Sequence, residues 1–78
     1  MSATISDITV HIDETLSDRE LGNLEQAIRS DEGVVSVGHN DKGKHFVVVL
    51  YDPEEIRGKD ILGRVTEQGF HGELIGFL

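Results

Sequence analysis

The chain has 78 residues, with 15 acidic and 7 basic side chains and a formal net charge of −8 at pH 7. This acidic balance argues against binding to nucleic-acid phosphates or to anionic membrane surfaces, both of which need clustered Lys and Arg. The sequence has no cysteine, which excludes disulfides, thiolate metal sites and a thiol nucleophile. The length fits one small domain over residues 1–78. A cytoplasmic location is expected, because no signal-peptide pattern or membrane-length apolar run appears.

The first predicted element is a strand that runs from Ile5 or Ser6 to Asp13, where apolar and polar residues alternate. A helix start follows it. Ser17 and Glu20 have the spacing of a capping box, in which each side chain accepts a hydrogen bond from the backbone N–H of the other residue. We therefore expect the first helix to begin directly after Ser17.

Apolar residues at helical spacing continue this helix towards Gly33, which suits the left-handed position after a helix end. Glu25 and Arg29 lie four residues apart and are expected to pair on the outer surface of the helix. Gly22 costs the helix roughly 1 kcal/mol relative to Ala. It is interpreted either as tolerated or as a point of close packing.

The second half of the chain contains two strand patterns, a helical pattern and a final strand pattern. The run at 46–51 is the strongest strand signal, because it is β-branched and aromatic throughout. The predicted segments are a strand opening at 34–37, a hairpin loop at 40–44, a strand at 46–51, a helix that starts between 54 and 60 and ends at 69, and a strand at 70–78.

This element order predicts an α+β fold, the ferredoxin-like βαββαβ sandwich. Each helix should connect its two flanking strands by a right-handed crossover, and a hairpin should join the second and third strands. A four-stranded antiparallel sheet in the order 4-1-3-2 meets both requirements. Both helices then cover one face of the sheet. The other face is left open.

Three stretches resemble the heavy-metal-associated domain: Gly33-Val34-x-x-Val37, Val47-x-Val49-x-Tyr51-Asp52-Pro53, and Ile61-Leu62 to Gly69-Phe70. That domain occurs in copper chaperones, metal-transporting ATPases and mercury-binding proteins. The resemblance extends roughly from Ile8 to Ile75. It implies the ferredoxin-like fold and a Met-x-Cys-x-x-Cys metal loop before the first helix.

When the sequence is aligned on these stretches, the two cysteine positions fall near Ser17 and Glu20. A hydroxyl and a carboxylate are hard ligands and do not replace two thiolates for Cu(I). These two residues therefore mark a degenerate metal loop, in which the thiolate site of the family is lost. The helix cap alone also explains them.

Alternation along the strand at 46–51 predicts which side chains lie on the open face of the sheet. They are Phe46, Val48 and Leu50, joined by Ile75 from the last strand. A contiguous apolar surface of this kind indicates an interaction site, used for homo-oligomer formation or for another protein partner. Alternatively, the C-terminal residues 76–78 fold across this surface.

Four histidines are placed by the predicted topology at one end of the sheet: His11, His39, His45 and His71. By strand parity, His11 and His71 share the open face with Glu73. This set is the best candidate site for a divalent transition metal, either Zn, Ni or Cu. The competing interpretation is that all four are ordinary surface residues.

The preferred function is a non-enzymatic domain, without a thiolate metal site, that acts as an interaction or self-association module. The alternative is a metal-binding protein with His and carboxylate ligands at the strand ends. An enzyme or ligand sensor on the same fold is disfavoured, because the sequence has no phosphate-binding glycine loop and no base positioned beside Ser17.

Overall fold

The computed structural model describes residues 4–40 and 43–75. The elements are β1 (Ser6–Ile12), α1 (Asp18–Arg29), β2 (Val34–Asn40), β3 (Gly43–Tyr51), α2 (Gly58–Glu67) and β4 (Gly72–Ile75). The predicted element order is confirmed, although β3 begins three residues earlier than its apolar run. Positions 41 and 42 of the expected hairpin loop, and residues 76–78 of the expected last strand, lie outside the described residues.

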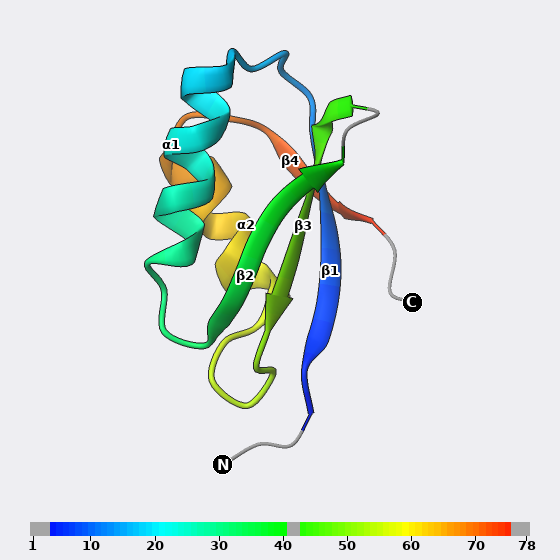
Figure 1. Ribbon diagram of the computed structural model, residues 1–78, viewed down its shortest axis with the longest axis vertical. Helices are drawn as coiled ribbons and strands as arrows, with labels where there is room; N and C mark the ends of the chain where they lie inside the picture. Colours follow the sequence, from blue (N-terminus) through cyan, green and yellow to red (C-terminus); the bar gives the residue numbers. More distant parts are fainter. Residues whose placement is uncertain (1–3, 41–42, 76–78) are drawn as a thin grey trace.

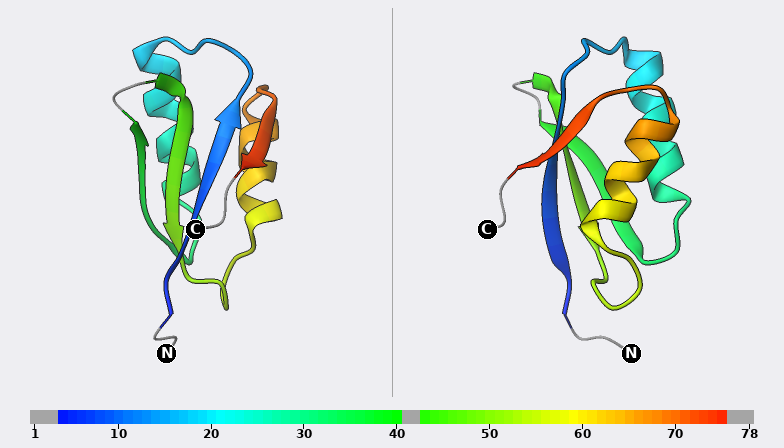
Figure 2. Two further views of the ribbon diagram at one scale, coloured as in Figure 1. Left: turned by 90° about the vertical axis from the view of Figure 1, so that its right-hand side faces the viewer. Right: turned by 180° about the vertical axis from the view of Figure 1, so that it is seen from behind.

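The four strands form one sheet in the order β2-β3-β1-β4, and every neighbouring pair is antiparallel. Both helices lie on the same side of this sheet (Figure 1). The left view of Figure 2 faces the opposite side, which no described element covers. The predicted ferredoxin-like α+β sandwich is therefore confirmed. Neither α1 nor α2 is long and apolar enough to cross a membrane.

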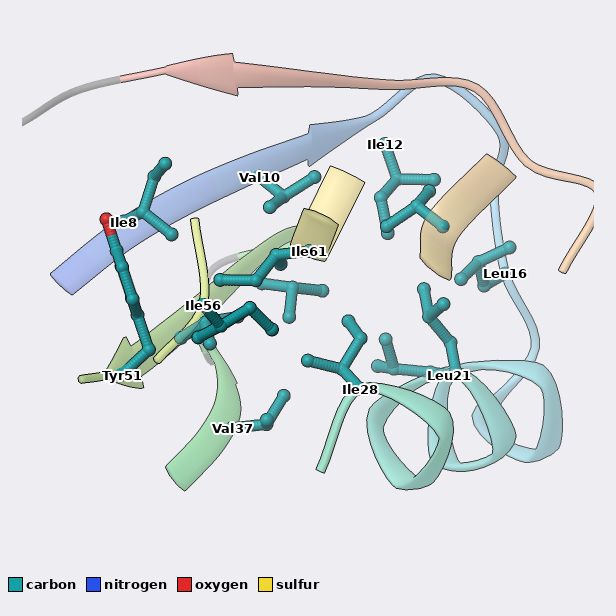
Figure 3. Packing of buried hydrophobic residues seen from close by; sticks show 14 residues of the cluster. Ile8, Val10, Ile12, Leu16, Leu21, Ile28, Val37, Tyr51, Ile56 and Ile61 are labelled. Atoms are coloured by element: carbon teal, nitrogen blue, oxygen red, sulfur yellow. The ribbon is translucent and has the colours of Figure 1, made fainter. Parts of the chain in front are cut away.

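The core lies between the helices and the sheet, and strand alternation decides which side chains enter it. On β1 and β3 every second residue is buried, and each helix contributes an apolar stripe at helical spacing. Figure 3 shows these side chains meeting between the two layers. The buried set is Ile8, Val10, Ile12, Leu16, Leu21, Leu24, Ile28, Val37, Val47, Val49, Tyr51, Ile56, Ile61 and Val65.

Gly22 is not a point of close packing. It is exposed on α1, and a Cβ built there has no neighbouring atom within 4 Å. We expect Gly22→Ala to stabilise the fold by about 0.5–1 kcal/mol, because it removes backbone entropy from the unfolded chain without any clash. Urea unfolding measures the gain. A loss of stability would show that this site is constrained after all.

Candidate functional site

The loop between β1 and α1 is closed by the predicted capping box. The backbone N–H of Ser17 donates to Oε1 of Glu20 at 2.9 Å, and the Glu20 N–H donates to Oγ of Ser17 at 3.1 Å. Leu16 and Leu21, on either side of the cap, are each 2 % exposed, as a hydrophobic staple requires. Both residues of the expected degenerate metal loop are therefore engaged in ordering the start of the helix.

Removal of the cap should destabilise the domain measurably. Ser17→Ala leaves the Glu20 N–H without its acceptor and is expected to cost about 1 kcal/mol. Ser17→Asp keeps an acceptor at the same position and should remain within about 0.5 kcal/mol of the wild type. Thermal and urea unfolding of the two variants compare these values. Equal loss in both would mean that the cap contributes nothing.

A second contact ties the same loop to the last strand. Glu14 accepts hydrogen bonds from both the backbone N–H of His71 at 2.8 Å and the Nδ1–H of its ring at 2.7 Å. The backbone N–H of Asp13 in turn donates to the carbonyl of His71 at 2.9 Å. The bond from the His71 backbone N–H is the main cause that lowers the pKa of Glu14 below 4.5. The Glu14 side chain raises the pKa of His71 above 6.5.

These two shifts make the contribution of the pair depend on pH in opposite directions. The stability from Glu14 is present above its ordinary pKa of 4.5 and is lost as the pH falls through its lowered value. The stability from His71 is present below 6.5 and is lost as the pH rises through its raised value. Glu14→Gln should therefore be most destabilising, relative to wild type, between these two values.

NMR titration gives the direct check on this pair. The pKa of His71 should fall in Glu14→Gln, because the carboxylate no longer stabilises the imidazolium. An unchanged His71 curve would contradict the contact.

His11 and His45 are brought together, as the predicted topology requires. Their rings stack with centroids 5.8 Å apart and an interplanar angle of 21°, and the His11 ring also lies 5.2 Å from Phe46. Nδ1 of His45 donates to the carbonyl of Ile12 at 2.7 Å, because a carbonyl oxygen can only accept. Nδ1 of His11 lies 3.5 Å from the carboxylate of Asp13.

His39 points to the helix side and lies 2.9 Å from Oε2 of Glu25 on α1. This corrects the predicted pair of Glu25 with Arg29. Arg29 instead donates from Nη2 to the carbonyl of Val37 at 3.1 Å. The spacing of four residues along α1 suggested the pair of Glu25 with Arg29. In the fold, β2 packs beside α1 and provides a partner for each of these two side chains.

The predicted metal set of His11, His71 and Glu73 is brought to one end of the sheet. Glu73 lies directly opposite His11 in the β1–β4 register. The ring of His71 is held by Glu14 through its Nδ1. Within residues 4–40 and 43–75, no three His, Cys, Asp or Glu side chains are grouped closely enough to hold an ion.

The open face carries a stripe of apolar side chains along β3. Phe46, Val48 and Leu50 are 37 %, 36 % and 36 % exposed, respectively. Because β1 separates β3 from β4, Ile75 does not adjoin this stripe directly. It lies opposite Thr9, on the other side of β1 from Val48, and is half-buried.

Several contacts were not predicted from the sequence, above all the one between Glu14 and His71. These residues are 57 positions apart. The predicted pairing of the first and last strands could have suggested their proximity, since both lie just beyond paired strand ends. Two further exposed apolar residues also escaped prediction: Ile5 is 51 % and Val35 is 56 % exposed. Val35 lies at a register irregularity of β2, where alternation gives no guide.

Comparison with solved structures identifies the same fold in metal-binding domains of P-type ATPases and in metallochaperones. The N-terminal domain of a potential copper-translocating P-type ATPase from Bacillus subtilis has a TM-score of 0.85 and 21% identity, with 96% of this chain and 92% of that chain covered. The copper binding domain of HMA7, a P-type ATPase, has a TM-score of 0.84 and 19% identity, with 92% and 96% covered.

Oxidized MerP from Ralstonia metallidurans CH34 has a TM-score of 0.83 and 15% identity, with 94% of this chain and 100% of that chain covered. These likenesses confirm the fold that the resemblance implied. No protein-family model matches the sequence, and no curated protein matches it significantly. The chain therefore shares the architecture of heavy-metal-associated domains, and its cysteine-free sequence lacks their thiolate pair.

Proposed function

We propose that this protein is a non-enzymatic interaction module that associates with itself through the open face of its sheet. The observation that carries this proposal is the stripe of Phe46, Val48 and Leu50 along a central strand. Strand β3 lies between β2 and β1, so its outward side chains form a continuous row on the uncovered side. Apolar residues in such a row favour docking, because contact removes them from water together.

The degenerate metal loop supports the same proposal. The similar solved structures are described as copper-binding or copper-translocating proteins. Here the corresponding loop carries Ser17 and Glu20, and the reciprocal hydrogen bonds between them hold the start of α1. A domain of this architecture that has no thiolates retains a stable scaffold and an open sheet face. Its small size adds to the argument, because a 78-residue domain gains stability from burying further apolar surface.

Sedimentation equilibrium over a wide range of concentration tests the proposal. Wild-type protein should show a reversible increase in mass, and Val48→Lys should remain monomeric, because the charge would have to be buried. Added Lys lowers the net negative charge, so this loss would not come from greater repulsion between chains. Val35→Lys is the matched control, since Val35 is exposed on the edge strand β2, outside the stripe. Wild-type protein that is monomeric at every concentration would overturn the proposal.

Metal binding at the histidine end of the sheet is the second candidate function. One observation in its favour is that Glu73 lies opposite His11 on the neighbouring strand. A second is that Nδ1 of His71 is engaged by Glu14, which leaves Nε2 of that ring as the atom that could bind a metal ion. Titration with Zn²⁺, Ni²⁺ and Cu²⁺, followed by the NMR signals of the histidine rings, tests it. Signals of His11 and His71 that do not change at saturating ion would rule this site out.

A further inference from the structure

The apolar stripe on β3 has a symmetric arrangement about its middle residue. Val48 is the centre, with Phe46 two residues before it and Leu50 two residues after it. All three are exposed to nearly the same extent. In an antiparallel superposition of two such strands about Val48, each Phe46 lies over a Leu50. Every apolar side chain of the stripe then meets another apolar side chain.

The neighbouring strand β1 repeats this arrangement with a histidine on one side of the centre and a carboxylate on the other. Thr9 pairs with Val48 across the β1–β3 ladder. In the same register His11 lies beside Phe46, and Asp7 lies beside Leu50. An imidazole, which can donate a hydrogen bond, and a carboxylate, which accepts one, therefore flank the stripe at equal and opposite distances from its centre. A surface of this pattern is complementary to itself.

We propose that the partner on the open face is a second copy of this chain, related by a twofold axis that crosses the strands through Val48 and Thr9. The rotation reverses the strand direction and keeps each strand over its own counterpart. Phe46 then lies over Leu50 of the second copy, and His11 lies over Asp7 of the second copy. This arrangement deepens the proposed self-association and rests on it.

Two other twofold arrangements fit the chemistry less well. An axis parallel to β3 puts Asp7 over Ser36 of β2 in the second copy and separates it from His11 of that copy. A sideways shift that places β3 over β1 buries Leu50 against Asp7, and a carboxylate buried without a partner is costly. Of these three arrangements, the axis across the strands is the one that matches apolar side chains and also places a hydrogen-bond donor, His11, over an acceptor, Asp7.

The position of His11 suits this contact. Its ring is stacked on His45 and Phe46, and its Nδ1 faces Asp13 at 3.5 Å. The side chain remains 34% exposed. In the tautomer that carries its proton on Nε2, the His11 ring can donate from that atom to the carboxylate of Asp7 of the second copy. Because the ring is already held in place, little conformational freedom is lost when the pair forms.

A pair of charge variants tests the axis directly. His11→Asp places a carboxylate opposite Asp7 of the second copy, and Asp7→Lys places an ammonium opposite His11. Each variant alone should dimerise at least about tenfold more weakly than wild type, since the altered contact occurs twice in a symmetric dimer. In a mixture of the two, the carboxylate introduced at position 11 of one chain meets the ammonium introduced at position 7 of the other, while the second contact remains as in wild type.

The mixture should therefore recover dimers, and these should be heterodimers by native mass spectrometry. Recovery also shows that both variants are folded. The double variant Asp7→Lys/His11→Asp in one chain should dimerise as wild type does. Matched controls are Gln26→Asp and Glu32→Lys, which change charge at positions away from the open face.

The outcomes separate the two proposals. Wild-type protein that never dimerises would overturn the self-association itself. Wild-type dimers that are lost in Val48→Lys, together with variants that do not recover on mixing, would leave the docking face intact and overturn this twofold axis. Controls that weaken the dimer as strongly as the test variants would also overturn it.

Discussion

Leu24→Ala is expected to lower the free energy of unfolding by about 3–5 kcal/mol, the range for a leucine removed from a well-packed core. Leu24 lies on the inner side of α1 and is 0% exposed. It belongs to the buried cluster between the helices and the sheet, so its truncation leaves a cavity among packed side chains. A domain of this length has roughly 4–12 kcal/mol of total stability. One substitution should therefore remove a large share of it.

Urea unfolding and thermal melting measure this loss, with a fall in melting temperature of about 4–8 °C per kcal/mol. Gln26→Ala is the control on the same helix, because Gln26 is exposed and its truncation should change stability by less than about 0.5 kcal/mol. If Leu24→Ala cost no more than Gln26→Ala, the placement of α1 on the sheet would be wrong.

Gly33→Ala should be the second most damaging change, for two separate reasons. Gly33 has a φ of +93°, a conformation that residues with a Cβ adopt at a cost of about 1–2 kcal/mol. A Cβ built on Gly33 would also lie only 2.8 Å from Cβ of Glu55 and 3.0 Å from Cγ2 of Ile56. The backbone of the loop before α2 would have to shift, and we expect a total loss of about 3 kcal/mol.

Gly69 separates these two costs. Its φ is +91°, nearly the same as that of Gly33, but a Cβ there has no atom within 4 Å. Gly69→Ala should therefore cost only the backbone term, about 1–2 kcal/mol. The difference between the two variants in urea unfolding gives the packing term at Gly33. Equal losses of unfolding free energy in the two variants would show that Glu55 and Ile56 can move away from the new Cβ at position 33 without destabilising the fold.

The sequence was enough to predict most of the fold, because its local signals agree with one another. Ser17 and Glu20 fixed the start of α1 through hydrogen bonds between residues three apart, which depend on no distant element. Gly33 was assigned to the left-handed position after the helix, and the structure confirms a positive φ. Alternation in β1 and β3 identified the buried face of each strand.

The candidate site was predictable only in part. Alternation placed Phe46, Val48 and Leu50 on the open face, because a period of two follows from strand geometry alone. It did not reveal that Thr9 lies between Val48 and Ile75, which depends on the pairing register of three strands. The surface is therefore a stripe along β3, with Ile75 set apart from it.

The partners of the charged side chains were decided by tertiary structure. Glu25 was assigned to Arg29 by helical spacing, yet it contacts His39 because β2 packs beside α1. Glu14 and His71 are far apart in the sequence and meet only because β1 and β4 are neighbours in the sheet. A charged side chain pairs with a partner that lies close to it in space. Spacing along the sequence gives the distance between two side chains only when both belong to the same helix or strand.

The amino-acid sequence by itself therefore determined the elements, their order, the buried faces and the absence of thiolates, since all of these follow from local hydrogen bonds, periodicity and residue type. Tertiary structure alone decided the register of β1 against β3. That register places His11 and Asp7 at equal and opposite distances from Val48. A one-residue shift would turn the alternate side chains to the other face and remove this arrangement. The physical reason is that register is a property of two strands together, fixed by how both bury their apolar side chains in one core.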